Sequence, residues 1–305
     1  MRHAGLVLAV LALLVAGCSP GPGDLRLLVP TEVGGGYDLT ARTLAAAIAE
    51  TEGASPPVVV VPGDGGRAAV ARLAAARADP DLVMVMGLGL LGAVPTAAGD
   101  ATPLTRLVTE PELVAVPAGS PYRTLGDLVA AWRADPSRVV VGGVSARGGP
   151  DWLVASRVAA AIGLPPGALR YRSLPGDALL PAVLRGEVSV AVTGLAETAP
   201  QVEAGTVRTL AVTSAQRTAR VDAPTLRESG VDVVLENWRG LLAPPGLDEA
   251  QVARLVSLVE GVRSSAAWRA AVARNGWTDA PLSGPAFAAF LAEQRDRVGE
   301  ALAAG

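Results

Sequence analysis

The stretch LRLLVPTEVGGGYDLTARTLAAAIAE, residues 25–50, places three consecutive glycines between two regular segments. The apolar run LRLLV, residues 25–29, predicts a short buried strand, and the alanine-rich segment after the glycines predicts a helix. Glycine loses much conformational entropy when its backbone is fixed, so Gly34, Gly35 and Gly36 need a reason beyond connecting the two elements. We interpret this loop as room for a ligand at the end of a strand.

The first residues have the pattern of an export signal. A short charged start precedes an apolar run, residues 4–15, that is too short to span a bilayer. The run ends in VAGC, which resembles a bacterial lipobox, so we expect residues 1–17 to be a signal peptide and Cys18 to carry a lipid. Residues 18–23 would then form a lipid anchor and tether that hold an extracytoplasmic body at a membrane. The alternative is an ordinary secretory signal with an incidental cysteine.

Composition excludes several classes of function. Cys18 is the only cysteine and His3 the only histidine, and both precede the predicted body. That body therefore lacks the residues of Cys/His proteases, of Ser/His/Asp hydrolases and of histidine-ligated zinc sites, and we expect no metal and no cofactor. All 26 basic residues are arginine, and a net charge of -3 gives no broad basic field for nucleic acid.

Strand-like apolar runs alternate with alanine-rich helical stretches along most of the chain. This alternation predicts an α/β architecture with largely parallel sheets. From residue 247 onward the pattern changes to helical spacing, with Asp248 and Gln251 as a plausible N-terminal cap, so we expect a C-terminal helical layer. The strand-like runs are LRLLV at 25, VVVV at 58, LVMVM at 82, ELVAVP at 112, RVVVG at 138, EVSVAV at 187 and TVRTLAV at 206.

Two motifs resemble catalytic or cofactor signatures but lack essential parts. GLGLLG, residues 87–92, matches G-x-G-x-x-G, yet Pro95 interrupts the helix that a dinucleotide site requires. We interpret it as a crossover that brings Gly87 to a cleft edge. GVSAR, residues 143–147, lacks the last glycine of a nucleophile elbow, and no histidine could activate Ser145.

Three glycine-rich loops, residues 34–38, 63–66 and 142–151, each follow a predicted strand and precede a predicted helix. Such loops line the crevice where ligands bind in open α/β sheets, and the N–H groups of the following helix favour an anion such as a carboxylate. The alternative is that these are tight turns in which Asp38 and Asp151 cap helices. Arg147 could contact a second carboxylate or lie in solvent.

Seven segments together resemble, in order and spacing, the extracytoplasmic solute receptors of tripartite tricarboxylate transporters, also called the Bug family. The resemblance covers the chain from about residue 25 to residue 302. The segments are VPTEVGGGYDLTAR, VPGDGGRAAVARLA, SPYRTLGDLVAAW, GGPDWLVA, VEAGTVRTLAVTSAQR, APTLRESGVDVVLENWRGLLAPPG and NGWTDAPLSGPAFAAFL.

The resemblance implies a type II periplasmic-binding-protein fold, in which a hinge joins two α/β domains around a central ligand cleft. We expect domain 1 to comprise residues 24–116 and 222–305, and domain 2 to comprise residues 117–221. It also implies a small organic-acid ligand, typically a di- or tricarboxylate, integral-membrane transporter subunits as partners, and a monomeric receptor. The resemblance places Gly34, Gly35, Gly36, Tyr37 and Asp38 on the domain 1 side of the cleft, and Gly143, Val144, Ser145, Gly148, Gly149 and Asp151 on the domain 2 side. The motifs above add Gly87 in domain 1 and Arg147 in domain 2 to the expected ligand-binding residues.

The chain departs from the family pattern at two places. The second loop reads GDGGR where the family usually has GAGG and a small residue, so Asp64 and Arg67 add charge near the cleft rim. Trp152 stands where related sequences often have histidine. Two other functions stay open at this point: an exported enzyme with Asp38, Asp64 and Asp151 as acid/base groups, and a lipoprotein scaffold without a small ligand.

Overall fold

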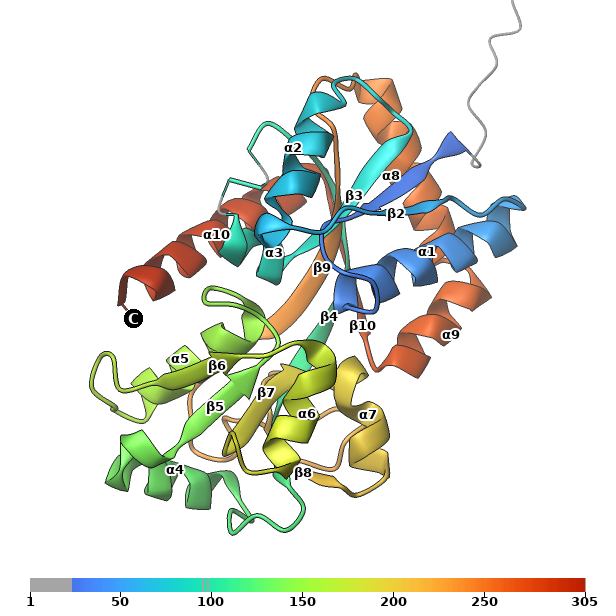
Figure 1. The fold of residues 1–305 in the computed structure, drawn as a ribbon. Helices are drawn as coiled ribbons and strands as arrows, with labels where there is room; N and C mark the ends of the chain where they lie inside the picture. Colours follow the sequence, from blue (N-terminus) through green and yellow to red (C-terminus); the bar gives the residue numbers. More distant parts are fainter. Residues whose placement is uncertain (1–23, 95, 98, 305) are drawn as a thin grey trace, which may run out of the picture.

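The computed structural model describes residues 24–94, 96–97 and 99–304 (Figure 1). The predicted signal peptide, the lipidation site Cys18 and the tether lie outside these residues. Within the described part of the chain, no helix is both long enough and apolar enough to cross a membrane.

A first sheet contains the strand that begins the quoted stretch. Strand β1 pairs in parallel with β2 and β3, β3 pairs antiparallel with β9, and β9 pairs antiparallel with β4. Strand β10 pairs antiparallel with β4. The bounds are β1 Arg26–Val29, β2 Val58–Val60, β3 Leu82–Gly87, β4 Thr102–Pro117, β9 Glu236–Ala243 and β10 Thr278–Ser283.

Strand β4 continues into a second sheet. Its residues 102–111 pair with β9, whereas residues 112–117 pair antiparallel with β7 and β8. Strand β7 is parallel to β5, which is parallel to β6. One long strand therefore joins the two sheets, as Figure 1 shows. The bounds are β5 Val140–Gly143, β6 Arg170–Ser173, β7 Val190–Gly194 and β8 Val207–Val212.

Helices cover both faces of the first sheet. Along β3, Val83 and Val85 pack in a core with α1, α8 and α9, whereas Met84 and Met86 pack with α2, α3 and α10. Because both faces of β3 are buried, its sequence reads as an uninterrupted apolar run. The bounds are α1 Gly36–Glu52, α2 Arg67–Ala75, α3 Leu88–Ala93, α8 Glu249–Arg263, α9 Ala266–Asn275 and α10 Gly284–Ala304.

The second sheet carries four helices, α4, α5, α6 and α7 (Figure 1). The core formed by α3 and α10 continues into this sheet through Val114, Val141 and Val192, where α4 and α5 pack. Helix α6 packs in a smaller core with Val188 and Ala191. The bounds are α4 Leu125–Ala134, α5 Pro150–Ala161, α6 Gly176–Leu184 and α7 Leu195–Glu203.

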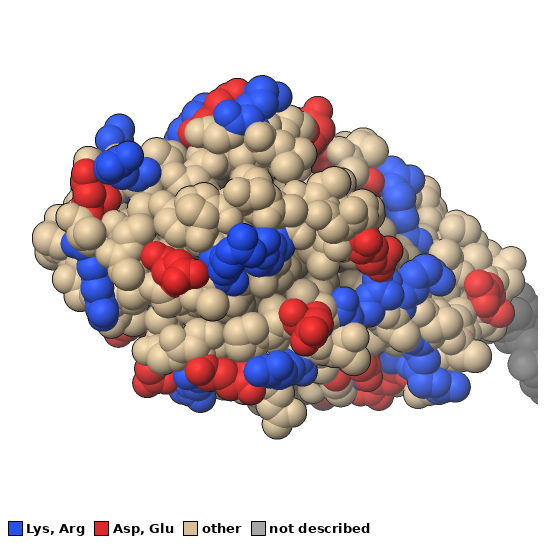
Figure 2. All heavy atoms as spheres, turned by 90° about the horizontal axis from the view of Figure 1, so that it is seen from below, with Lys and Arg blue, Asp and Glu red and all other residues tan. Residues whose placement is uncertain are grey.

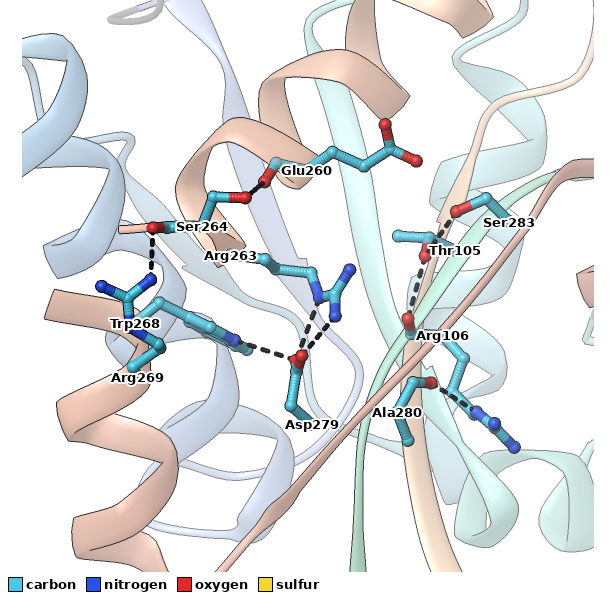
Figure 3. Close-up of polar contacts among 10 residues, drawn as sticks. All are labelled: Thr105, Arg106, Glu260, Arg263, Ser264, Trp268, Arg269, Asp279, Ala280 and Ser283. Atoms are coloured by element: carbon cyan, nitrogen blue, oxygen red, sulfur yellow. Dashed lines mark hydrogen bonds and ion pairs between the residues drawn. The ribbon is translucent and has the colours of Figure 1, made fainter. Parts of the chain in front are cut away.

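The predicted C-terminal helices are present, and a strand that the pattern did not predict lies between the last two. Asp279 in β10 receives hydrogen bonds from Arg263 in α8 and from Trp268 in α9, and Arg106 in β4 donates to the carbonyl oxygen of Ala280 (Figure 3). Long-range contacts thus hold β10 in place. Its local sequence therefore lacks the alternating apolar pattern of a strand.

The expectation of parallel strands holds for β1, β2 and β3 and for β5, β6 and β7, whereas β4, β8, β9 and β10 pair antiparallel. On the face seen from below, acidic and basic side chains are interspersed among other residues (Figure 2). That face therefore has no broad patch of a single charge.

Candidate ligand-binding cleft

The three glycines of the first loop lie immediately before and at the start of α1. Gly34 has a φ of 87°, in the left-handed region that favours glycine. A Cβ atom at Gly36 would lie 2.4 Å from Nη2 of Arg239, so the missing side chain allows this guanidinium to approach the helix start. Gly35 occupies the N-cap position, and no side chain there accepts from the first helical N–H groups. The start of α1 therefore offers donors to a ligand.

Asp38 turns its carboxylate back onto the same loop. Its Oδ2 accepts hydrogen bonds from the Gly34 N–H at 2.9 Å and from Arg42 Nε at 2.9 Å. Burial raises the pKa of Asp38, but the hydrogen bonds from Arg42 and Gly34 outweigh this effect, so the pKa lies below its ordinary value. Asp38 stays ionised at neutral pH and holds the loop in shape.

Tyr37 connects the start of α1 to the loop after β3. Its hydroxyl accepts the N–H of Leu90 at 2.7 Å. A Cβ at Gly87 would lie 2.9 Å from the Tyr37 ring and 2.4 Å from the Trp238 carbonyl oxygen, so glycine is required for this packing. Burial raises the pKa of Tyr37 to about 12, so the hydroxyl keeps its proton. The structure thus brings Gly87 beside the first glycine loop.

Asp151 holds the second-sheet loop in a similar way. Its Oδ2 accepts the N–H groups of Val144 at 2.6 Å and of Ser145 at 2.8 Å. The Tyr171 hydroxyl donates to the Ser145 carbonyl oxygen at 2.6 Å, and a Cβ at Gly143 would lie 2.2 Å from that hydroxyl. Burial raises the pKa of Asp151 to about 6, although these N–H groups lower it. Two amides that we expected to be free for a ligand therefore bind the protein's own carboxylate.

The end of this loop contacts helices of both sheets. A Cβ at Gly92 in α3 would lie 1.9 Å from the carbonyl oxygen of Gly148 and 3.0 Å from the nitrogen of Gly149, so glycine at position 92 permits this approach. Arg147 turns toward α10: its Nη2 donates to the Leu302 carbonyl oxygen at 3.2 Å, and its guanidinium lies 5.2 Å from the centre of the Trp152 ring. A ligand contact by Arg147 stays a prediction.

Asp64 and Arg67, the unusual residues of the remaining glycine loop, form an exposed ion pair at 3.4 Å. Asp38, Asp64 and Asp151 are thus each engaged by groups of their own loop or the adjoining helix turn. The structure gives no support for these three carboxylates as one acid/base group.

An acidic cluster, defined here as Glu110, Glu112, Asp151 and Glu197, was missed by the sequence reasoning. Glu110 and Glu112 lie on β4 with 1% and 0% exposure. Glu110 forms an ion pair with Arg239 of β9, which is 3% exposed. Glu197, on the first turn of α7, accepts a hydrogen bond from Thr193 Oγ1 at 3.2 Å and is an exposed residue. The Arg239–Glu110 pair lies between Gly36 and Gly194, the residues that start α1 and precede α7.

The carboxyl groups of the cluster raise one another's pKa values, because their negative charges repel. Burial raises the pKa of Glu112 well above its ordinary value, and the negative charges of Asp151, Glu110 and Glu197 raise it further. Glu197 is exposed as a residue, so its carboxyl group loses only part of its water shell; this partial desolvation and then the charges of Asp151 and Glu110 raise its pKa to about 7. One sequence signal was available: Glu112 begins a predicted strand. The prediction placed Glu112 at the start of a strand, but β4 begins ten residues earlier, at Thr102. Glu112 therefore lies in the middle of the strand, where it is buried.

A separate cavity of about 330 Å³ lies between α5, α10 and strands β4 and β9. Thr109 and Trp238 line it, whereas their chain neighbours Glu110 and Arg239 belong to the paired charges described above. Since successive side chains of a strand point to opposite faces, the cavity and the acidic cluster lie on opposite faces of these strands.

Comparison with known proteins identifies the family. The chain matches the family model described as "Tripartite tricarboxylate transporter family receptor" over residues 42–304. The chain belongs to this receptor family. A curated relative, Protein BugT of Bordetella pertussis, is 25% identical over 290 residues, which cover 90% of this chain and 86% of BugT.

Solved structures agree with the fold of a tripartite tricarboxylate transporter receptor. An R. palustris protein determined with adipate is 24% identical, with a TM-score of 0.81 and coverage of 92% of this chain and 97% of that chain. MatC of Rhodopseudomonas palustris, determined with bound malate, is 22% identical, with a TM-score of 0.76 and coverage of 91% and 98%. The predicted type II periplasmic-binding-protein fold is confirmed.

Proposed function

We propose that this protein is an extracytoplasmic receptor that captures a small carboxylate and delivers it to the integral-membrane subunits of a tripartite tricarboxylate-type transporter. The observation that carries the proposal is the uncapped start of α1 at a glycine loop, which offers N–H donors beside Arg239. The two solved relatives with malate and adipate, both dicarboxylates, support this ligand class. Di- and tricarboxylates and related organic acids are the candidates.

Capture would proceed by closure of two lobes, domain 1 (residues 24–116 and 222–305) and domain 2 (residues 117–221). Strand β4 runs between the two sheets, and the chain returns to the first sheet at β9. A ligand that contacts the loop before α1 and the loop before α5 gains both sets of contacts only in the closed form, so binding shifts the population toward closure.

We further propose that Cys18 carries the lipid that anchors the receptor at the membrane and that the receptor acts as a monomer. Mass spectrometry of the membrane fraction would show a lipid-modified Cys18. Recovery of an unmodified chain that begins elsewhere would contradict the anchor.

The test of the binding site compares Gly35→Val with Gly119→Val. A Cβ at Gly35 meets no atom closer than 3.7 Å, so valine there preserves the fold but covers the first N–H groups of α1. Gly119 lies in an exposed loop, and a Cβ there would meet no atom within 4 Å. Calorimetry with carboxylates selected by thermal-shift screening should show binding to the wild type and to Gly119→Val, and at least about tenfold weaker binding to Gly35→Val. Equal affinities would refute this site.

A further inference from the structure

The cavity between α5, α10, β4 and β9 has three arginines in its lining. Arg106 lies on β4, Arg157 on α5 and Arg297 on α10, whereas the lining contains one acidic residue, Glu236 of β9. Arginine keeps its charge at any physiological pH, so the lining has an excess of positive charge. The volume of about 330 Å³ falls at the lower end of the range for pockets that hold small organic molecules. The cavity therefore has the charge and the size to hold a small organic anion.

Arg157 is the arginine with the fewest partners. It is half-buried, and its side chain forms no hydrogen bond or ion pair with the residues that the structure describes. Burial lowers the pKa of Arg157 and the positive charge of Arg297 lowers it further, whereas the exposed Glu300 opposes both effects. A partly desolvated guanidinium beside a second one is stabilised by a negative charge, so an anion is the partner that this position lacks.

The other two arginines also have donors to spare. Arg106 donates from Nε to the carbonyl oxygen of Ala280 at 2.7 Å (Figure 3), and its Nη atoms bind no other group of the described chain. Arg297 pairs with Glu293, an exposed residue outside the lining of the cavity. Because a guanidinium carries five N–H donors, each of these residues can still bind an oxygen of a ligand.

Much of the remaining lining is apolar and partly aromatic. Trp238 is 1% exposed, and its ring meets that of Phe290 edge to face with centroids 5.2 Å apart. The Arg106 guanidinium lies 4.8 Å from the centre of the Phe290 ring. Leu153 and Val298 also line the cavity. Such a lining favours an aromatic ring, which packs on other rings and on aliphatic side chains.

A buried donor in the lining also lacks an acceptor. The Nε1 of Trp238 has no hydrogen-bond partner within the described part of the chain. Buried polar groups are usually paired, and one that is not often marks a place where a ligand or a water completes the bond.

Helix periodicity explains how cationic and apolar groups come together. On α10, Phe290, Gln294 and Arg297 are four and three residues apart, and on α5, Leu153 and Arg157 are four residues apart. Residues at these spacings lie on one face of a helix. Each helix therefore presents both an arginine and an apolar residue to the same cavity.

The sheet separates this cavity from the start of α1. Trp238 lines the cavity, whereas its chain neighbour Arg239 lies against Gly36 at the start of α1. Side chains of neighbouring residues in a strand point to opposite faces, so β9 lies between the two places. A ligand in the cavity would not occupy the site that we propose for the carboxylate.

We propose that this cavity is a second binding site, separate from the start of α1, for a small aromatic oxyanion, that is, an aromatic ring that carries a carboxylate or a phosphate group. The oxyanion binds Arg157 and Arg297, and the ring packs against Trp238 and Phe290. The inference goes beyond the proposed receptor function and does not depend on it.

The experiment uses matched probes that lack either the charge or the ring. Calorimetry at pH 7.5 would compare phenylacetate with the neutral phenylacetamide, and phenyl phosphate with inorganic phosphate. We expect phenylacetate or phenyl phosphate to bind at least about tenfold tighter than its matched probe. The stronger of the two aromatic anions identifies the oxyanion that the site prefers.

Two variants and a control connect this binding to the cavity. Arg157→Gln and Arg297→Gln should each weaken binding of the preferred aromatic anion by at least about tenfold, because a neutral amide cannot pair with an oxyanion. Arg295→Gln, at an exposed position of α10 outside the lining, should leave the affinity unchanged. Arg297 is an exposed residue, so its variant tests the inference even if Arg157→Gln does not fold.

Gly35→Val separates this site from the start of α1. We expect the variant to bind the aromatic anion with wild-type affinity, and a crystal soaked with the anion to show density between Arg157 and Trp238. Loss of affinity in Gly35→Val but not in Arg157→Gln would place the anion at the start of α1, which would overturn the inference and support the receptor site.

The remaining outcomes also decide the inference. It is wrong if neither aromatic anion binds, if each binds no tighter than its matched probe, or if Arg157→Gln and Arg297→Gln both keep wild-type affinity. None of these three results changes the proposed receptor function, which is tested at the start of α1 with other carboxylates.

Discussion

At the scale of single residues, Asp38 and Asp151 have matching roles. Each lies in the first turn of a helix and accepts hydrogen bonds from amide groups of the loop before that helix. Asp38 binds the N–H of Gly34, and Asp151 binds the N–H groups of Val144 and Ser145. The glycine loops are therefore shaped by carboxylates of the protein itself. The start of α1, where glycine occupies the N-cap, is the place that we propose for the ligand.

Glu112→Gln should stabilise the protein at high pH. The pKa of Glu112 is raised in the folded state, so ionisation weakens folding as pH rises from the ordinary value of 4.5 toward the folded-state pKa. Glutamine keeps the shape and removes this effect. We expect a gain of about 1 to 3 kcal/mol in unfolding free energy at pH 8 and little change at pH 4, measured by chemical denaturation. A gain of equal size at both pH values would contradict the assignment of a buried, ionisable Glu112.

Tyr37→Phe should destabilise the protein by about 1 to 3 kcal/mol, because the N–H of Leu90 would lose its acceptor in a buried position. Thermal or urea denaturation measures this loss. Tyr122→Phe is the matched control, since the hydrogen bonds of Tyr122 involve its backbone and not its hydroxyl. Equal effects of the two substitutions would mean that the Tyr37 hydroxyl does not tie α1 to the loop after β3.

At the scale of elements, helix ends explain both stability and binding. Helix α8 begins with a capping box, in which the Asp248 side chain accepts the N–H of Gln251 and the Gln251 side chain accepts the N–H of Asp248. Helix α1 has no such cap. The chain therefore caps the start of α8 and leaves open the start of α1, where we propose that the ligand binds.

Asp248→Ala should cost about 1 kcal/mol of stability, because the start of α8 loses its cap, and should leave ligand binding unchanged. Denaturation and calorimetry check the two parts. Glu249→Ala removes a neighbouring exposed acid whose effect is limited to the helix dipole, about a few tenths of a kcal/mol. A loss of ligand affinity in Asp248→Ala would contradict this account, because it would show that the start of α8 affects the proposed binding site.

The sequence pattern predicted the elements whose local signals are strong. The run LVMVM is apolar because β3 is buried on both faces, and the cap of α8 follows a known residue pattern. Strands β6, β9 and β10 were missed because tertiary pairing, with β5 for β6 and with β4 for β9 and β10, and not local propensity, makes them strands. In the cleft, the glycine loops were recognisable, whereas Arg239 and Glu110 were not, since residues 129 positions apart pair only after the sheets form.

At the scale of the whole molecule, the proposed capture depends on how the two sheets approach each other. Helix α3 of the first sheet meets the loop before α5 at Gly92 and Gly148, where the backbones are too close for a side chain at position 92. One hydrophobic core runs on both sides of this contact. If the two lobes close as proposed, this contact limits how far they can approach each other.

Gly92→Val should hold the lobes apart, because the new Cβ would meet the backbone of Gly148. We expect ligand affinity to fall by about tenfold or more and small-angle scattering to show a larger radius of gyration with saturating ligand than for the wild type. Gly119→Val serves again as the control. Wild-type affinity and compaction in Gly92→Val would mean that closure does not require this contact.

The most direct test of the central claim is a crystal structure of the protein with a carboxylate ligand identified by thermal-shift screening. The account predicts ligand density between the loops before α1 and α5, with carboxylate oxygens within hydrogen-bond distance of the N–H groups of Gly36 and Tyr37. Density in the cavity beside Arg106 and Arg157, with the start of α1 unoccupied, would contradict it.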